Sequence, residues 1–391
     1  MTGPATDLAV VVARSESGES VDVFIHADPS STRDDPRAQF QSMVEGAHRA
    51  LRDQGILPSG VVSGWLRFAA RPSWDWRQAL GDLWQFTGVL PITALVQPPA
   101  KPFCACSLSL HAIRASRQSG VWQGPSAGPA AATVLRAGAR HVRLMSVTPR
   151  PQFLKTGSFA DMTYDMFAQA GHALTARGLS FGKVARTWVH VRDIERNYGL
   201  VNQARNRYFA DQHLTRLPAS TCVAGTPAEV DCPVALDVYA ISDAEAVRVE
   251  AVAPGSMGEA SAYGAAFARA TRISEPGRRW LLVSGTASID AQGRVVATGD
   301  LPGQLACMFG NVEALLAGSG MTTGDVLTAT AYLKRGDDLG AFIRAARACG
   351  LGPDVPCTVA VADICRPEWL CEIELCAARK DAPAPQVSGL D

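Results

Sequence analysis

The chain has 391 residues, more than one ordinary domain needs, which suggests two or three packed units. Hydrophobic residues make up 47% of the sequence and charged residues 19%, as in a globular protein, and Lys plus Arg equals Asp plus Glu at 37 each. This balance gives no electrostatic basis for binding nucleic acid or an anionic membrane, although a local basic group could still bind a small anion.

Ten cysteines raise the question of disulfides or metal binding. Residues 1–20 carry charges within their apolar run, unlike a signal peptide, and no stretch approaches the length of a membrane span. We therefore expect a cytoplasmic, reducing location with free thiols. Cys104 and Cys106 stand two apart, but no second pair or histidine lies at ligand spacing from them, so we expect no structural zinc.

The first third of the chain begins with strand patterns and continues with a helix that ends at a glycine. A tryptophan-rich segment, residues 71–86, then precedes two more strands. In chain order, hydrophobic periodicity predicts strands at Leu8–Val12 and Val21–Ile25, a helix at Gln39–Gln54, and strands at Val61–Phe68, Leu90–Gln97 and Cys106–Ile113.

The same order of helix, glycine and strand recurs twice further along the chain. Gly178, Gly182 and Val184 map onto Gly320, Gly324 and Val326 at one constant offset, and each helix-ending glycine suits a left-handed residue that stops a helix. Three copies indicate an internal threefold array of α+β units. The predicted helices of the later copies are Tyr164–Arg177, Tyr198–Gln212, Gly303–Ser319 and Leu339–Cys349, and the predicted strands are 218–221, 234–241, 355–358 and 370–377.

We expect the units to span residues 1–145, 146–250 and 251–380. We expect the first unit to be degenerate and the third to contain the alternating strand Leu370–Ala377. Gly120–Gly138, rich in Gly, Ala, Ser and Pro, is predicted to be an irregular connection, and Ala251–Glu259 a linker. The tail Lys380–Asp391 is expected to be disordered, with residues 381–391 lying beyond the third unit.

The segment Val361–Leu375 contains the first candidate for chemistry. Two apolar runs flank a polar corner, and the second run continues as an alternating strand. Alternation places Glu372 and Glu374 on one face of that strand. A carboxylate on a core strand is costly unless it is paired or protonated, so this pattern indicates a general acid/base or a structural ion pair. Periodicity alone does not separate Glu372 from Glu374.

The third unit resembles the RidA (YjgF) family, whose small α+β units assemble as trimers. The matching residues are Ala262-Tyr263-Gly264, Val283-Ser284-Gly285-Thr286 and Glu372-Ile373-Glu374. The whole chain is more specifically similar to the chorismatases, in which RidA-like units are fused. The residues that carry this resemblance are Ala262–Arg269, Arg186–Asn202, Leu217–Gly225 and Ala362–Arg366, in the family's order.

The resemblance implies a pseudo-trimer of RidA/YjgF-like (chorismate-mutase-like) units with mixed sheets packed against helices. Two departures from the family patterns matter. Cys222 stands where chorismatases more often have glycine, and Cys357 stands where RidA deaminases carry the arginine that binds the substrate carboxylate. The second departure disfavours imine deamination.

The resemblance also implies cleavage of the enol ether of chorismate, releasing pyruvate and a cyclic acid. This reaction needs a proton delivered to the vinyl methylene carbon, and a partly buried carboxylic acid with a raised pKa suits that task. The resemblance assigns it to Glu372. At the position of Cys365, a cysteine resembles the 3-hydroxybenzoate-forming subfamily, where it would shape the pocket and redirect water; otherwise Cys365 is one more buried thiol.

The two substrate carboxylates call for guanidinium groups, whose planar fork matches a carboxylate. The resemblance places Tyr263 and Arg269 in the substrate site; otherwise they are a core tyrosine and a rim arginine. Arg205 and Arg366 are further binding candidates, against the alternative that both are solvated.

We therefore predict a cofactor-free, metal-free chorismatase that makes 3-hydroxybenzoate and pyruvate for secondary metabolism, with chorismate as its small-molecule partner. The alternatives are a chorismatase that gives 4-hydroxybenzoate or a dihydroxycyclohexadiene carboxylate, a RidA-like imine deaminase, and a non-catalytic module that binds small acids. The sequence leaves the choice between monomer and homo-oligomer open.

Overall fold

The computed structural model describes residues 10–17, 20–115, 121–123, 129–253 and 255–380, whose strands form three six-stranded sheets. The first sheet has the order β1 (Val10–Ser17), β2 (Ser20–Ala27), β5 (Cys106–Ala115), β3 (Val61–Phe68), β4 (Ile92–Val96), β11 (Thr226–Pro227). The second has the order β10 (Ala219–Ala224), β9 (Val184–Val191), β12 (Val234–Ile241), β8 (Ala139–Val147), β7 (Ala130–Arg136), β6 (Val121–Gln123). The third has the order β13 (Arg248–Val252), β14 (Ala270–Glu275), β15 (Arg278–Ala287), β18 (Cys371–Lys380), β16 (Val326–Leu333), β17 (Cys357–Val361).

The three sheets share one connectivity. Each contains five strands in the same order: an antiparallel pair (β1/β2, β7/β8, β14/β15), a central strand (β5, β12, β18) and a parallel pair (β3/β4, β9/β10, β16/β17). The sixth strand of each sheet is an added edge strand: β11, β6 or β13. A helix joins the two strands of each parallel pair, as parallel pairing requires: α2 (Trp76–Trp84), α5 (Ile194–Asp211) or α7 (Leu339–Ala348). The predicted α+β array of three units is confirmed.

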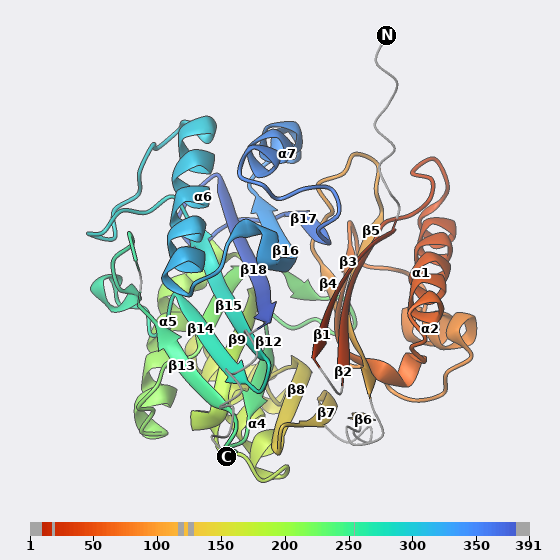
Figure 1. The fold of residues 1–391 in the computed structure, drawn as a ribbon, viewed down its shortest axis with the longest axis horizontal. Coiled ribbons are helices and arrows are strands. Elements are labelled where there is room, and N and C mark those ends of the chain that lie inside the picture. The colour runs from red at the N-terminus through yellow and green to blue at the C-terminus, as the bar shows by residue number, and fades with distance from the viewer. Residues whose placement is uncertain (1–9, 18–19, 116–120, 124–128, 254, 381–391) are drawn as a thin grey trace, which may run out of the picture.

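The other helices are α1 (Pro36–Asp53), α3 (Pro151–Thr156), α4 (Phe159–Thr175) and α6 (Leu301–Gly318). Figure 1 shows α1 and α2 on the outer side of the first sheet, while the three sheets turn their other faces toward one another. Long helices α1, α4 and α6 are each followed by a glycine with positive φ, at 66° for Gly55, 71° for Gly178 and 70° for Gly320. The predicted glycine stops are therefore confirmed.

Each unit buries an apolar core between its helices and the outer face of its sheet. Phe40, Phe167 and Phe309 are representative, at 1% exposure or less. A separate apolar cluster joins the inner faces of the sheets and includes Trp188 and Trp280. The molecule is thus held together both within units and along the seams between them.

The prediction that Gly120–Gly138 is irregular is wrong in part. Residues 121–123 form β6, and residues 130–136 form β7, which turns back into β8 through Ala137 and Gly138, both with positive φ. The small residues of β7 permit close packing on both faces: Ala131 lies in the core of the second unit and Ala132 against residues of the first unit. The small residues that resemble a loop composition therefore belong to a strand that packs between the first and second units.

Two other connections also differ from expectation. Strand β13 includes Ala251 and Val252, so the expected linker begins in a strand, and Lys380 is the last residue of β18. The remainder of the expected tail lies outside the described residues, as does the start of the predicted strand Leu8–Val12.

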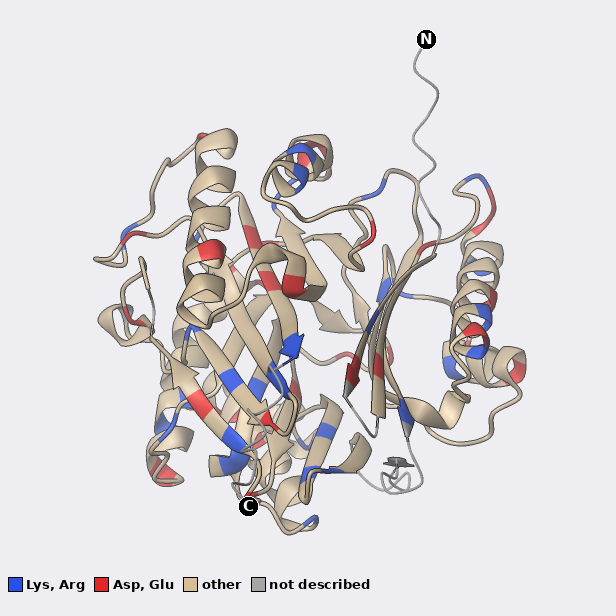
Figure 2. Cartoon of the chain, in the orientation of Figure 1, with Lys and Arg blue, Asp and Glu red and all other residues tan. Residues whose placement is uncertain are grey.

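Charged residues occur on the outer helices and also on the strands that face one another (Figure 2). In the described ranges, no helix is both long and apolar enough to cross a membrane.

Candidate active site

The candidate site lies on the seam between the second and third sheets. Edge strand β10 of the second unit is fastened to β15 of the third by hydrogen bonds from Ser220 N–H to Ser284 Oγ (2.9 Å) and from Gly285 N–H to Thr221 Oγ1 (2.9 Å). The β15 strand has a bulge between Val283 and Thr286, opposite β18. This bulge brings the backbone of Gly285 close to the next strand, where the candidate acid lies.

Glu372 is placed by β18, which lies between β15 and β16, and its residue exposure is 4%. Its carboxyl group lies against Gly285, where a Cβ atom would collide with Oε1. Burial is the main cause that raises the pKa of Glu372 to about 8; the nearby Glu374 carboxylate raises it further, while Arg186 and Arg269 act in the opposite direction. Glu372 is thus mostly protonated near neutral pH.

This raised pKa predicts how pH changes stability. Between the ordinary glutamate value and about 8, the folded state binds a proton at Glu372 that the unfolded state has released, so the free energy of unfolding falls as pH rises through this window. Each unit of pKa difference is worth about 1.4 kcal/mol. We expect Glu372→Gln to lose this dependence, so that its stability relative to wild type increases from pH 5 to pH 8 in urea unfolding. A constant difference across that range would contradict the prediction.

Glu374 has a different environment from Glu372. It pairs with Arg186 Nη2 at 2.5 Å, accepts a hydrogen bond from Tyr332 Oη at 3.2 Å, and accepts another from Thr221 Oγ1. Among the described residues, the Glu372 carboxyl has no ion pair. Glu374 therefore carries the structural ion pair, whereas Glu372 keeps a raised pKa.

Glu372 lines a cavity that both units share. The second unit contributes residues of α5 and β10, and the third contributes β15, β18 and the loops beside them. The lining residues are Tyr198, Arg205, Ser220, Cys222, Phe267, Arg269, Gly285, Ala287, Ile289, Cys365, Trp369 and Glu372.

Cys365 lies at the corner between β17 and β18, on the wall of this cavity. A β-bridge between Ile364 and Val223 joins this corner to the second unit. Gln304 of α6 holds the other side of the corner: it donates to the Glu368 carbonyl and accepts from Leu370 N–H, both at 2.8 Å. Burial, with the nearby Glu372, raises the pKa of the Cys365 thiol well above its usual value. The thiol is therefore neutral, a wall of the cavity and not a thiolate nucleophile.

Two of the predicted arginines meet in the cavity. Arg205 is 1% exposed and comes from α5, and Arg269 is 3% exposed and precedes β14. Their guanidinium carbons lie 5.5 and 5.3 Å from the ring centre of Phe267, and Arg269 donates twice to the Gly258 carbonyl. Arg205 Nη2 donates to Asn202 Oδ1 at 2.5 Å, whereas its Nε has no partner among the described residues. This arrangement offers donors to an anion in the cavity.

The other two predicted binding residues have different outcomes. Arg366 is directed to the Gly293 carbonyl (2.8 Å) and the Trp369 ring, and it is absent from the cavity wall. The side chain of Tyr263 lies outside the described part of the structure.

Sequence reasoning did not select Tyr198, Phe267 or Trp369 as site residues, although all three line the cavity. Tyr198 and Phe267 fall within the motifs Arg186–Asn202 and Ala262–Arg269, which would have been the signal. Tyr198 hydrogen-bonds the Cys365 thiol across the seam, a contact that the chain order does not reveal. Trp369 is fixed by a 2.8 Å hydrogen bond to the Ser288 carbonyl.

The cavity thus combines a protonated acid, two guanidinium groups and an apolar and thiol wall. Such a site can bind a small anion and protonate it while water access is restricted. Within the described ranges, no three His, Cys, Asp or Glu side chains converge as metal ligands would.

Comparison with solved structures finds a resemblance over most of the chain. A crystal structure titled as a chorismatase at 1.08 Å resolution has a TM-score of 0.63 at 18% identity, with 82% of this chain and 93% of that chain covered. An L-PSP endoribonuclease-like structure from Entamoeba histolytica covers 34% of this chain and 100% of its own, with 22% identity and a TM-score of 0.29. The family model described as Endoribonuclease L-PSP matches residues 261–379. No curated protein matches the chain.

Proposed function

We propose that the chain is a chorismatase that converts chorismate to 3-hydroxybenzoate and pyruvate. The observation that carries the proposal is Glu372, an acid with a pKa of about 8 in a cavity that also contains Arg205 and Arg269. The fold shared with a chorismatase structure supports it. The substrate is an enol ether with two carboxylates, so it matches both the proton donor and the guanidinium groups.

In this proposal, Glu372 donates its proton to the terminal methylene carbon of the enolpyruvyl group. The positive charge that develops on the ether carbon and oxygen weakens the bond between that oxygen and the ring. The oxygen of the neighbouring ring hydroxyl bonds to the ring carbon that carried the ether oxygen, which gives an epoxide; pyruvate leaves as a ketone, and the hydroxyl proton returns to the Glu372 carboxylate. The bond between the epoxide oxygen and its original carbon then breaks. The carbon that keeps the oxygen loses its proton as the ring aromatises, and the oxygen takes up a proton, so the two balance. No water is consumed overall.

Cys365 would favour this outcome over hydrolysis. Its neutral thiol and the adjacent Cys222 occupy part of the wall near Glu372, and a thiol holds water less well than a hydroxyl or carboxylate does. Arg205 and Arg269 would hold the two substrate carboxylates, and Tyr198 would fix the position of Cys365. Two buried guanidinium groups also explain why an anionic substrate would enter a cavity lined by a potential carboxylate.

Incubation of the purified protein with chorismate tests the proposal directly. We expect stoichiometric pyruvate and 3-hydroxybenzoate without added metal or coenzyme. Formation of 4-hydroxybenzoate or of the dihydroxycyclohexadiene acid would retain the chorismatase activity but contradict the product assignment. Ammonia from imino acids would support a deaminase, and saturable chorismate binding without turnover would support a non-catalytic binding module.

Replacing Cys365 with alanine should redirect the product. Removing the thiol opens space for a water molecule next to Glu372, so we expect the non-aromatic dihydroxy acid to become the main product while pyruvate release continues. Product analysis by chromatography measures the change, and Cys349→Ala, which alters a half-buried thiol outside this cavity, is the control. Unchanged 3-hydroxybenzoate as the sole product would remove Cys365 from the mechanism.

A further inference from the structure

A second cavity is lined by strands of all three sheets; we call it the axial cavity. The strand registers show which residues of the three sheets occupy equivalent positions in the wall of this cavity. Phe24 pairs with His111 in the first sheet, Arg143 with Tyr239 in the second, and Leu282 with Cys376 in the third. Phe24, Arg143 and Leu282 therefore occupy equivalent positions, and the second unit alone places a charge there.

The closest contacts of the Arg143 guanidinium are aromatic rings. Its guanidinium carbon lies 3.5 Å from the ring centre of Tyr239 and 6.0 Å from that of Trp188. Its Nη2 is 3.5 Å from His111 Nδ1, and His111 Nε2 is 2.7 Å from Asp22. Within the part of the chain that the structure describes, Arg143 has no ion pair.

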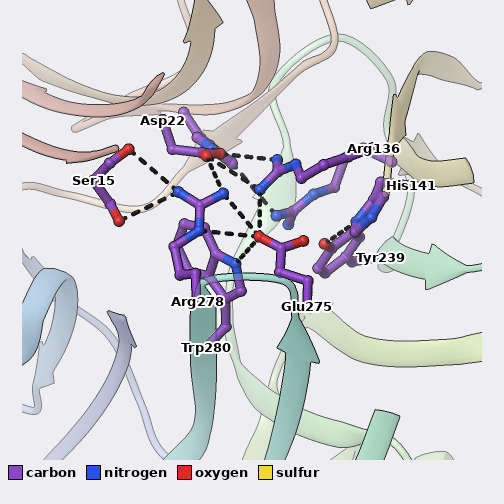
Figure 3. Close-up of polar contacts among 10 residues, drawn as sticks. Ser15, Asp22, Arg136, His141, Tyr239, Glu275, Arg278 and Trp280 are labelled. Carbon is purple, nitrogen blue, oxygen red and sulfur yellow. Dashed lines mark hydrogen bonds and ion pairs between the residues drawn. The ribbon is translucent and has the colours of Figure 1, made fainter. Parts of the chain in front are cut away.

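The buried acids near the axial cavity already have guanidinium partners. Asp22 and Glu275 share Arg136 and Arg278, with the nitrogen–oxygen distances of these ion pairs between 2.8 and 3.1 Å (Figure 3). This group holds two positive and two negative charges and is electrically balanced.

The other buried charges beside the cavity have polar partners. Arg186 pairs with Glu374, Asp237 lies 3.3 Å from His190 Nε2, and Arg67 donates to Gln97 and Ser109. Among the described residues, Arg143 has neither an ion pair nor a hydrogen bond to an oxygen atom. A buried charge without a counter-charge is costly, so Arg143 indicates that an anion completes the site.

Two further donors on the same wall lack partners. Ser63, 1% exposed, leaves its hydroxyl without a hydrogen bond, and Arg186, 2% exposed, leaves Nη1 without one, as judged over the described residues. Both line the axial cavity with Arg143. Buried donors are satisfied in nearly all native structures. A bound anion would accept from both.

The rest of the wall is mixed. Its polar members are Ser109, His111, Thr328, Thr330 and Glu374, whose carboxylate already pairs with Arg186. Its apolar part includes Phe24, Leu282 and two tryptophans, Trp65 and Trp188, whose ring centres lie 5.0 Å apart. Such a surface suits the body of an organic molecule better than a hydrated inorganic ion.

We propose that the axial cavity is a binding site for a small aromatic monocarboxylate. Its carboxylate accepts hydrogen bonds from Arg143, Arg186 and Ser63, and its ring lies against Trp65 and Trp188. The site is separate from the Cys365–Glu372 cavity and does not depend on the reaction proposed there.

Crystals soaked in 4-bromobenzoate test the location, because the anomalous signal of bromine identifies its position. We expect bromine in the axial cavity. Bromine confined to the Cys365–Glu372 cavity, or absent from both, overturns the proposal.

Calorimetric titration with the same probe tests the role of Arg143. Arg143→Leu installs the residue that the third unit uses at the equivalent position, so the fold should tolerate it. We expect it to weaken binding at least about tenfold, because a charge-assisted hydrogen bond is lost, while Arg143→Lys keeps part of the affinity. Chorismate turnover should not change. Unchanged affinity in Arg143→Leu overturns the proposal.

Thr330→Phe provides an independent test should Arg143→Leu fail to fold. Thr330 occupies the position equivalent to Trp65 and Trp188, as shown by its pairing with Glu374, so a ring there fills the cavity without altering a charge. We expect Thr330→Phe to abolish probe binding, and retained binding overturns the proposal. Arg205→Leu, which alters the other cavity, is the matched control and should leave axial binding intact.

Discussion

Glu372→Gln should reduce pyruvate release from chorismate by about 10²- to 10⁴-fold, the contribution typical of a positioned general acid. Glutamine has nearly the same size and can occupy the same space against Gly285, but its amide cannot supply the proton that the methylene carbon needs. The measurement is kcat from continuous detection of pyruvate. Retention of most of the activity would refute the assignment of Glu372 as the acid.

Two further observations separate loss of chemistry from loss of structure. Glu372→Gln should bind chorismate and unfold with wild-type cooperativity, because Glu372 forms no ion pair with any residue that the structure describes. Glu374→Gln should instead destabilise the fold by about 3–5 kcal/mol, because it leaves the buried Arg186 guanidinium without its counter-charge. In the wild type, turnover should fall as pH rises through about 8, since the acid then loses its proton.

The fold was largely predictable because the internal repeat shows itself in short-range sequence patterns. Helix-ending glycines at 55, 178 and 320, and alternating strands such as Val234–Ile241, depend on neighbours in the chain and need no tertiary information. Strand β7 was missed because its alanines satisfy packing demands from two units at once. Propensity does not report such a demand.

The site was predictable only in part, for a similar reason. Period-two alternation placed Glu372 and Glu374 together, yet what distinguishes them is the arrival of Arg186 and Thr221 from the second unit. The hydrogen bond from Tyr198 to Cys365 likewise crosses the seam. The axial cavity has contributions from all three units, so no local pattern could indicate it. Arg143 alone looks like an ordinary charged residue on a strand.

Gly285→Ala should reduce turnover by at least about 10²-fold although residue 285 carries no reactive group. The backbone of Gly285 is not left-handed, so alanine is acceptable there in itself. The added Cβ, however, would lie 2.9 Å from Glu372 Cδ and 3.3 Å from Thr221 Cγ2, and would collide with Glu372 Oε1. Because Gly285 N–H is fixed to Thr221 by a 2.9 Å hydrogen bond, the carboxyl group and not the backbone must move.

A displacement of about 1 Å at a catalytic group can cost about 10²-fold in rate, so kcat should fall much more than the stability of Gly285→Ala does. Gly310→Ala is the matched control: it lies on α6 of the same unit, and its added Cβ would meet no atom within 4 Å. We expect that control to keep full activity and to gain up to about 1 kcal/mol of stability from helix propensity. If Gly285→Ala turned over chorismate as fast as Gly310→Ala, the carboxyl position against Gly285 would not be the reactive one, and the proton would have to come from another group in the cavity.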